Sequence, residues 1–252
     1  MGGIDKQAKG SNPGILWVNS KITKPDELSP QAYQKWYEEV HIPDIFKSGG
    51  IKEASRWETV NPSDERPYLA VYPLEDLDFL QTAKFKAIPV HDKNLPGSHA
   101  IFDIADFDTR YYRFVQLYEP AGSESKSTLI VSKGQPDFVI SAGFTPSDDE
   151  DYENWYRQEH LKEVSGITGW RRTERYALTF ARQNRKPVGE KQISEPPKFL
   201  TMHFFDGESL PAKELEGAGN SEWTKKNMSS MKETSMGIFS KLSQYSKDGS
   251  KP

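Results

Sequence analysis

Residues 33–45 read Tyr-Gln-Lys-Trp-Tyr-Glu-Glu-Val-His-Ile-Pro-Asp-Ile, and residues 152–164 read Tyr-Glu-Asn-Trp-Tyr-Arg-Gln-Glu-His-Leu-Lys-Glu-Val. Both segments contain the pattern Tyr-x-x-Trp-Tyr-x-x-x-His, and an acidic residue follows each histidine by three positions, as Asp44 and Glu163. Agreement between two distant segments of one chain is the sign of an internal repeat. We therefore expect two copies of one structural unit.

The agreement between the copies continues downstream of these segments. Further matches follow in the same order: Gly50-Ile51 with Gly166-Ile167, Arg56-Trp57 with Arg175-Tyr176, and residues 68–72 with 199–203. Small and charged residues replace apolar ones at 121–127, which we interpret as a linker. The predicted organisation is a disordered tail at 1–13, a first half at 14–120, the linker, a second half at 128–245 and a tail at 246–252.

Hydrophobic periodicity and turn residues predict one order of elements in both halves. The first half has expected strands at 15–18, 54–60, 68–72 and 111–118, with helices at 30–41 and 76–87. The second has expected strands at 138–144, 170–177, 199–205 and 237–245, with helices at 147–164 and 211–217. Ser29 and Ser147 are the expected helix caps, and Pro43 is expected to end the first long helix close to His41.

Each half therefore has the order β-α-β-β-α-β of a ferredoxin-like unit. Such a unit covers one face of its sheet with helices and leaves the other face bare. The two bare faces can be buried against each other in a duplicated chain. The predicted fold class is α+β, with two ferredoxin-like halves packed sheet to sheet as one barrel-type domain.

Composition and charge exclude several classes of function. The chain of 252 residues contains no cysteine, which excludes disulfides, thiolate metal sites and cysteine nucleophiles. A net charge of −4 provides no basic field for nucleic acid or an anionic membrane. No apolar run approaches the roughly 20 residues of a membrane helix, and residues 1–14 do not read as a signal peptide, so we expect a cytoplasmic protein. Nucleotide-binding glycine motifs and metal-binding histidine motifs are absent, and no metal site is expected.

The segment Trp-Tyr-x-x-x-His, placed between an apolar strand and a glycine turn, resembles the EthD-like branch of the dimeric α/β-barrel superfamily. His41-Ile42-Pro43 is similar to the His-x-Pro element of that family, whereas His160-Leu161-Lys162 lacks the proline. The resemblance implies a tandem version in which one chain closes the barrel. It also implies a cofactor-free enzyme, because the family includes monooxygenases, polyketide cyclases, decarboxylases, lyases and isomerases.

His41 and His160 are the first candidates for catalysis. The acid three residues on, Asp44 or Glu163, would lie close to the imidazole on a helix and orient it. A histidine held in this way can transfer a proton as a general base or acid. The alternative is a structural histidine that hydrogen-bonds a loop carbonyl, and its presence in both halves favours that alternative.

His203 and Tyr72 are the second pair of candidates. An alternating strand at 199–205 places Phe199, Thr201, His203 and Phe205 on one face and Leu200, Met202 and Phe204 on the other. We expect the apolar set to pack under the helices and the mixed set to face the barrel interior, as Tyr72 would on its own strand. His203 and Tyr72 would then form an acid–base pair in an aromatic chamber, with a buried and internally satisfied histidine as the alternative.

Five further residues are candidates for substrate binding: Asn19, Arg56, Trp57, Ser141 and Arg175. An interior arginine could hold a carboxylate or phenolate by two parallel hydrogen bonds. We favour the alternative for both arginines, which is a cross-strand pair with an acid or a solvated edge. Asn19 and Ser141 would be polar groups in the interior, and Trp57 would be part of the core or of a cavity wall.

These residues and the resemblance predict a cofactor-independent lyase, cyclase or decarboxylase. Its substrate would be a small aromatic or polyketide-like molecule inside the barrel. A cofactor-free monooxygenase and a non-catalytic protein, either a small-molecule binder or a stress-associated protein with a solid interior, are the alternatives. The expected assembly is a monomer that forms a pseudo-dimer, or a homodimer.

Overall fold

The computed structural model describes residues 11–120, 136–184 and 195–247. The strands in these ranges are β1 (Gly14–Ile22), β2 (Glu53–Thr59), β3 (Tyr68–Leu74), β4 (Ala105–Tyr118), β5 (Phe138–Thr145), β6 (Trp170–Gln183), β7 (Phe199–Phe205) and β8 (Glu233–Ser246). The α-helices are α1 (Pro30–Trp36), α2 (Ile42–Lys47), α3 (Ala83–Lys86), α4 (Asp149–Trp155), α5 (Leu161–Ser165), α6 (Ala212–Ala218) and α7 (Glu222–Ser229). The π-helical turns are η1 (Tyr37–His41) and η4 (Tyr156–His160), and the 3-10 turns are η2 (Leu77–Gln81) and η3 (Ile101–Asp103). The linker predicted at 121–127 lies outside the described residues.

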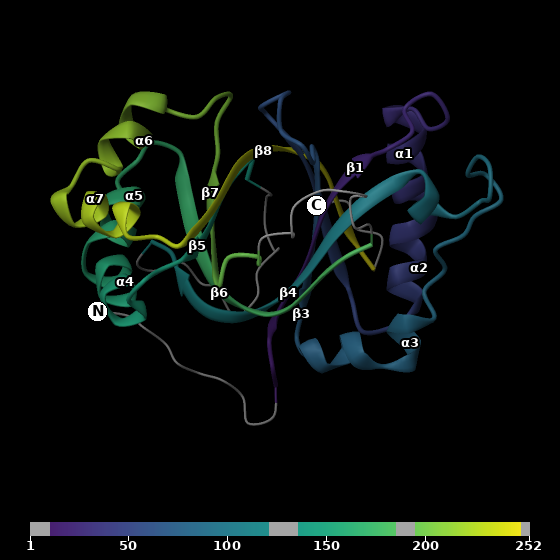
Figure 1. Ribbon diagram of the computed structural model, residues 1–252, viewed down its shortest axis with the longest axis horizontal. Helices are drawn as coiled ribbons and strands as arrows, with labels where there is room; N and C mark the ends of the chain where they lie inside the picture. The colour runs from purple at the N-terminus through teal and green to yellow at the C-terminus, as the bar shows by residue number, and fades with distance from the viewer. Residues whose placement is uncertain (1–10, 121–135, 185–194, 248–252) are drawn as a thin grey trace.

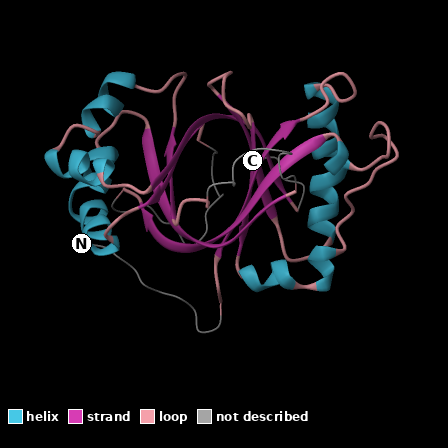
Figure 2. Cartoon of the chain, in the orientation of Figure 1, coloured by secondary structure: helices cyan, strands magenta, loops and turns pink. Residues whose placement is uncertain are grey.

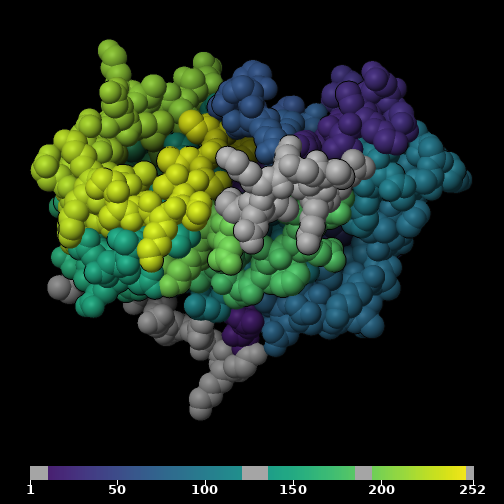
Figure 3. Space-filling model, viewed as in Figure 1, coloured from purple at the N-terminus to yellow at the C-terminus, as the bar shows by residue number. Residues whose placement is uncertain are grey.

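The strands form one closed barrel in the order β1-β3-β2-β8-β5-β7-β6-β4. Strands β1–β4 contribute the order β4-β1-β3-β2, and β5–β8 contribute the corresponding order β8-β5-β7-β6. Antiparallel pairing of β4 with β6 and of β2 with β8 joins the two sets. Helices α1–α3 lie on one side of the barrel and α4–α7 on the opposite side (Figures 1 and 2). In the space-filling view the two halves meet as one continuous body (Figure 3).

Apolar side chains from all eight strands form one buried cluster inside the barrel, beside the charged pairs Arg172–Glu174 and Arg110–Asp108. The cluster consists of Ile15, Trp17, Trp57, Leu69, Val71, Tyr112, Val139, Tyr176, Leu200, Met202, Phe204 and Phe239. Each of these residues is less than a tenth exposed. Burial of aromatic and aliphatic side chains on this scale is the main source of stability for such a barrel.

The two faces of β7 point in the opposite directions to those predicted. Leu200, Met202 and Phe204 point into the barrel, whereas His203 lies under the second group of helices, where its ring meets His160. On β3, Tyr72 likewise packs in the cluster beneath the first helices. The alternation along each strand was predicted, but the wholly apolar set belongs to the closed interior because the helices supply aromatic and polar partners to the other face.

The first long helix does not end at His41. Ile42 keeps right-handed helical backbone angles, and its N–H bonds to the carbonyl oxygen of Tyr37, five residues back. The π turn η1 restarts the helix, so Pro43 stands in the first turn of α2, where a missing N–H is tolerated. The helical run therefore continues to Lys47.

Other boundaries differ in smaller ways. Asp148, not Ser147, caps α4, because its carboxylate accepts the backbone N–H groups of the following turn. Ser29 caps α1 as predicted. The expected helix at 76–87 is broken at Thr82, whose extended backbone separates η2 from α3. Helix α7 was not predicted, and β4, β6 and β8 are longer than the sequence pattern indicated.

Candidate active site between helix and sheet

The first copy of the repeat places three aromatic side chains against the outer face of the sheet. Tyr33, Trp36 and Tyr37 are buried there because their three- and four-residue spacing puts them on the one side of the helical run that faces the strands. His41 stacks on the Trp36 ring at a centroid distance of 4.8 Å and an interplanar angle of 15°. The Tyr37 ring is nearly perpendicular to the same imidazole, at a centroid distance of 5.1 Å and an interplanar angle of 86°.

His41 is held as a neutral imidazole. Burial lowers its pKa to about 4, and the guanidinium of Arg56 adds to this effect against the opposing charge of Asp44. The residue is partly exposed, but its Nδ1 atom is buried and has no hydrogen-bond partner among the described residues. A neutral imidazole with an unpartnered nitrogen is in the deprotonated form that a general base needs at pH 7, and a pKa of about 4 makes it a weak base.

Arg56 reaches the same layer from β2 and is 1% exposed. Its guanidinium lies 4.1 Å from the centroid of the Tyr37 ring. One nitrogen, Nη1, donates to Oε1 of Gln34 at 2.5 Å. The other two, Nε and Nη2, have no hydrogen-bond partner in the part of the chain that the structure describes. A buried cation with two unused donors is costly unless a further acceptor reaches it.

Tyr72 completes the group from β3. Its side chain is 1% exposed. Burial, followed by the neighbouring phenol of Tyr37, raises the pKa of Tyr72 well above its usual value. The phenol is therefore uncharged at neutral pH and can act only as a neutral hydrogen-bonding group.

The second half repeats this arrangement with one change of charge. His160 stacks on Trp155 at 4.5 Å and 26°, and burial lowers its pKa to about 4. Arg175 lies 4.2 Å from the centroid of the Tyr156 ring. Its Nη2 and Nη1 atoms donate to the two carboxylate oxygens of Glu153 at 2.6 and 3.1 Å. An ion pair of Arg175 with an acid on a neighbouring strand was expected. The acid that pairs with it is instead Glu153 on helix α4.

His203 belongs to this second layer rather than to the barrel interior. Its Nδ1 atom lies 2.9 Å from Oγ1 of Thr173, and its ring centroid is 5.8 Å from that of His160. Burial lowers the pKa of His203 well below its usual value. This placement separates His203 from Tyr72, since each packs under the helices of its own half. The two side chains therefore do not form the predicted pair.

The two acids do not hydrogen-bond the histidines they were expected to orient. Asp44 accepts a hydrogen bond from Lys47 at 2.8 Å. Oε2 of Glu163 is 3.9 Å from Nδ1 of His160, which is beyond hydrogen-bonding distance. Asp44 thus acts on His41 through its charge alone.

The remaining candidates for substrate binding have partners within the fold. Asn19 Nδ2 donates to the carbonyl oxygens of Arg66 and Tyr68, both at 3.0 Å. Ser141 Oγ donates to the carbonyl of Gly237 at 3.4 Å. Trp57 belongs to the barrel core, which is one of the two positions predicted for it.

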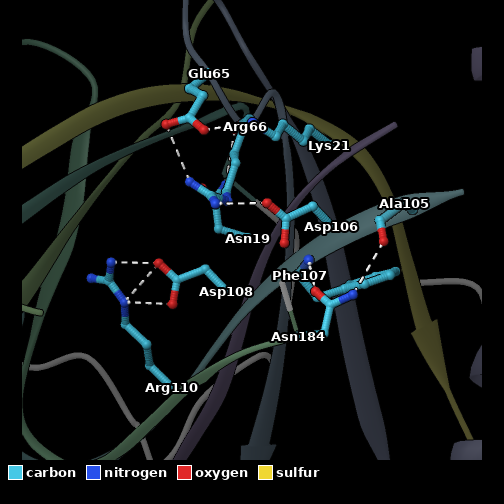
Figure 4. Close-up of polar contacts among 10 residues, drawn as sticks. All are labelled: Asn19, Lys21, Glu65, Arg66, Ala105, Asp106, Phe107, Asp108, Arg110 and Asn184. Carbon is cyan, nitrogen blue, oxygen red and sulfur yellow. Dashed lines mark hydrogen bonds and ion pairs between the residues drawn. The ribbon is translucent and has the colours of Figure 1, made fainter. Parts of the chain in front are cut away.

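A charged cluster around one end of β4 was missed at the sequence level. Arg66 Nη2 lies 2.8 Å from Asp106, and Arg110 Nη2 lies 2.6 Å from Asp108 (Figure 4). Asn184 ties the same strand to the end of β6 through its contacts with Phe107 and Ala105. The alternation of Asp106, Asp108 and Arg110 along the strand was the available signal. These charges are paired with each other, which favours a structural role.

Sequence reasoning also missed residues inside the repeat itself. Trp36 and Tyr37 are the ring surfaces that hold His41, and Gln34 contacts Arg56. Their order in the two copies was visible, but not that their rings pack on the histidine. No group of three or more potential metal ligands occurs among the described residues. None of the described helices has the length and apolar character needed to cross a bilayer.

The lowered pKa values of three histidines predict how the free energy of unfolding depends on pH. His41, His160 and His203 have lowered pKa values when folded and titrate near pH 6.5 when unfolded. The unfolded chain therefore binds more protons below about pH 6.5, and the free energy of unfolding is expected to fall as the pH decreases. Urea unfolding between pH 7 and 5 measures this change, and the double variant His160→Asn/His203→Asn should show a smaller slope. A free energy of unfolding that rises as the pH falls from 7 to 5 would contradict the lowered pKa values assigned to these histidines.

Comparisons with known proteins found a relative in sequence and several solved structures with a similar fold. No protein-family profile matches it. Core atranone cluster (CAC) protein 1 of Stachybotrys chlorohalonatus is 29% identical over 223 residues, which cover 84% of this chain and 88% of that protein. An anthrone oxidase-like protein has a TM-score of 0.58 at 15% identity, with 97% of this chain and 96% of that chain covered.

Two further solved structures have the same arrangement. A candidate monooxygenase of Fusobacterium nucleatum has a TM-score of 0.55 at 9% identity, and the match covers 96% of this chain and 98% of that chain. A chlorite dismutase variant from Candidatus Nitrospira defluvii has a TM-score of 0.54 at 11% identity, and the match covers 92% of each chain. At these identities the likeness concerns the fold. The chain has the eight-stranded antiparallel barrel of the dimeric α/β-barrel proteins, closed within one polypeptide.

Proposed function

We propose that the protein is an enzyme that removes a proton from a small aromatic or polyketide-like compound at the helix–sheet layer of the first half. One observation carries the proposal. Nδ1 of the neutral His41 is buried without a hydrogen-bond partner in the described part of the chain, and the nearby guanidinium of Arg56 contributes to its lowered pKa. A base beside a fixed positive charge suits the formation of an enolate or phenolate.

The proposed division of roles follows from the two groups. His41 accepts the proton from carbon or from a phenol. Arg56 stabilises the negative charge that remains on the substrate oxygen, in a layer from which water is largely excluded. Tyr72 supplies a neutral hydrogen bond. This step begins an elimination or an aldol-type cyclisation, which is the lyase or cyclase reaction that we favour.

Oxygenation of the same anion is the second candidate. It is supported by two of the structural neighbours, which are described as an anthrone oxidase-like protein and a monooxygenase candidate. The relative from the core atranone cluster supports a role in the formation of a natural product. Both candidate reactions share the deprotonation step, and they differ in whether oxygen is consumed.

The proposed reaction takes place in the layer outside the sheet and not in the barrel interior. Inside the barrel, aromatic and aliphatic side chains form a buried cluster, and the charged groups that contact it are paired with each other. The shared strand order of the two sets of strands supports two ferredoxin-like units, and the His-x-Pro segment supports the EthD-like relationship. Because one chain supplies both sets of strands, we propose that the protein acts as a monomer.

Deuterium exchange tests the proposed step. Anthrone is a suitable probe because loss of a methylene proton gives an aromatic phenolate. The purified protein is expected to accelerate deuterium incorporation from D₂O into this methylene group, as measured by NMR without oxygen. His41→Asn should slow the exchange by about 10²-fold, and His91→Asn, in the loop before η3, should not.

The outcomes separate the reaction types. Exchange without oxygen, together with oxygen uptake when air is admitted, would identify the oxygenase. Exchange without any oxygen uptake would support the lyase or cyclase. Exchange no faster than in buffer, or exchange that depends on His160 and not on His41, would contradict the proposal.

A further inference from the structure

Gln34 and Glu153 occupy the same position, the second residue, in the two copies of the repeat. Each contacts the buried arginine of its own half. Glu153 takes two hydrogen bonds from Arg175, whereas Gln34 takes one from Arg56. A neutral amide in one half thus stands where a carboxylate stands in the other.

The two arginines are equally buried, with 1% and 2% exposure. Arg175 has its charge balanced by Glu153, which bonds its Nη1 and Nη2 atoms, and Gln116 accepts a further hydrogen bond from it at 3.0 Å, so that only Nε of Arg175 lacks a partner among the described residues. Arg56 has no such ion pair among the described residues. The carboxylate of Glu38 bonds to the Gln34 amide rather than to Arg56. The first half therefore contains a buried positive charge that has no direct counter-ion within the ranges that the structure describes.

The unused donors of Arg56 have a definite geometry. Nε and Nη2 of an arginine form one edge of the planar guanidinium, and their N–H bonds point the same way. Both of these atoms are buried and lack a hydrogen-bond partner within the described ranges. This edge matches a planar acceptor with two oxygens, such as a carboxylate or the enolate of a 1,3-dicarbonyl compound.

We propose that position 34 keeps the first site open to a planar two-oxygen anion, and that Glu153 closes the second site as a built-in counter-ion. This inference rests on the proposed function, because the anion that binds Arg56 is the substrate or its deprotonated form. It makes Gln34 and Glu153 the residues that decide which half is active. The two halves then differ in role: the first half binds the anion, and the ion pair of the second half stabilises the fold.

Binding of 2-naphthoate, with neutral 2-naphthamide as the uncharged isostere, tests the inference by titration calorimetry. The wild-type protein is expected to bind one naphthoate and to bind naphthamide at least about tenfold more weakly, the factor that one charge-assisted hydrogen bond carries. Gln34→Glu should lose the site and raise the melting temperature, because the new carboxylate pairs with Arg56. Glu153→Gln should gain a second site, and the double variant should bind one naphthoate.

Exposed positions on the same helices provide matched controls. Gln31→Glu and Glu150→Gln make the same changes of charge on α1 and α4, at exposed residues, and should bind as the wild type does. Gln34→Glu decides the question even if Glu153→Gln fails to fold. Unchanged binding in Gln34→Glu, a folded Glu153→Gln without a second site, or no binding to the wild type would overturn the inference.

Failure of this inference is distinguishable from failure of the proposed function. Naphthoate binding that depends on position 34, without deuterium exchange into anthrone, would contradict the proposed proton transfer and leave the anion site standing. Exchange that depends on His41, without naphthoate binding, would contradict the anion site alone.

Discussion

Replacing Arg56 with methionine is expected to slow deuterium exchange by about 10²- to 10³-fold, the range found when one group that stabilises a developing oxyanion is removed. The free energy of unfolding should stay within about 1 kcal/mol of the wild-type value, because methionine keeps most of the buried volume and leaves no carboxylate without a partner. Exchange kinetics and urea unfolding of the same preparation measure the two quantities.

Arg175→Met is the matched variant in the second half. It leaves Glu153 without its two hydrogen bonds from the guanidinium. We expect a loss of about 1–3 kcal/mol in the free energy of unfolding, since the partly exposed carboxylate regains some hydration. Exchange should persist in the protein that remains folded. If Arg56→Met is the more destabilising of the two and retains exchange, the roles given to the two arginines are wrong.

Replacing Trp57 with alanine is expected to have the largest effect on stability, with a loss of about 3–5 kcal/mol in the free energy of unfolding. The indole is 1% exposed in the centre of the barrel, and its ring lies 6.3 Å from that of Phe204. Trp57 and Arg56 are neighbours on β2 and point to opposite faces. Exchange in the folded fraction should therefore be reduced much less than in Arg56→Met.

An exposed apolar residue next to the same strand serves as the control for the buried Trp57. Val60 follows β2 and is 45% exposed, so Val60→Ala should change the free energy of unfolding by at most about 0.5 kcal/mol. A small effect of Trp57→Ala, similar to that of Val60→Ala, would mean that the barrel centre is loosely filled. The proposed location of the site outside the sheet would then lose its main support.

The repeat allowed most of the architecture to be predicted. The pattern around His41 and His160 indicated two equivalent units, and the order of strands and long helices follows from periodicity and turn residues. The alternation of β7 was also predicted. Its direction was not, because the pattern of Leu200, Met202 and Phe204 is the same whether that face meets helices or a second set of strands.

The chemistry of the site was less accessible from sequence. Pro43 is locally a helix breaker, and only the π turn makes it the start of a new helical segment. Arg56 and Arg175 look equivalent because each stands at the same place in its copy of the repeat and is followed by an aromatic residue, Trp57 or Tyr176. Their difference lies at Gln34 and Glu153, far away along the chain, and it became visible when the helix was packed on the sheet.

A crystal structure of the protein soaked with 2-naphthoate would test the location of the site most directly. We predict that the ring lies between the first helical run and the sheet, with the carboxylate on Nε and Nη2 of Arg56 and the ring close to His41. Naphthoate in the centre of the barrel, or against Arg175 in the second half, would contradict this account.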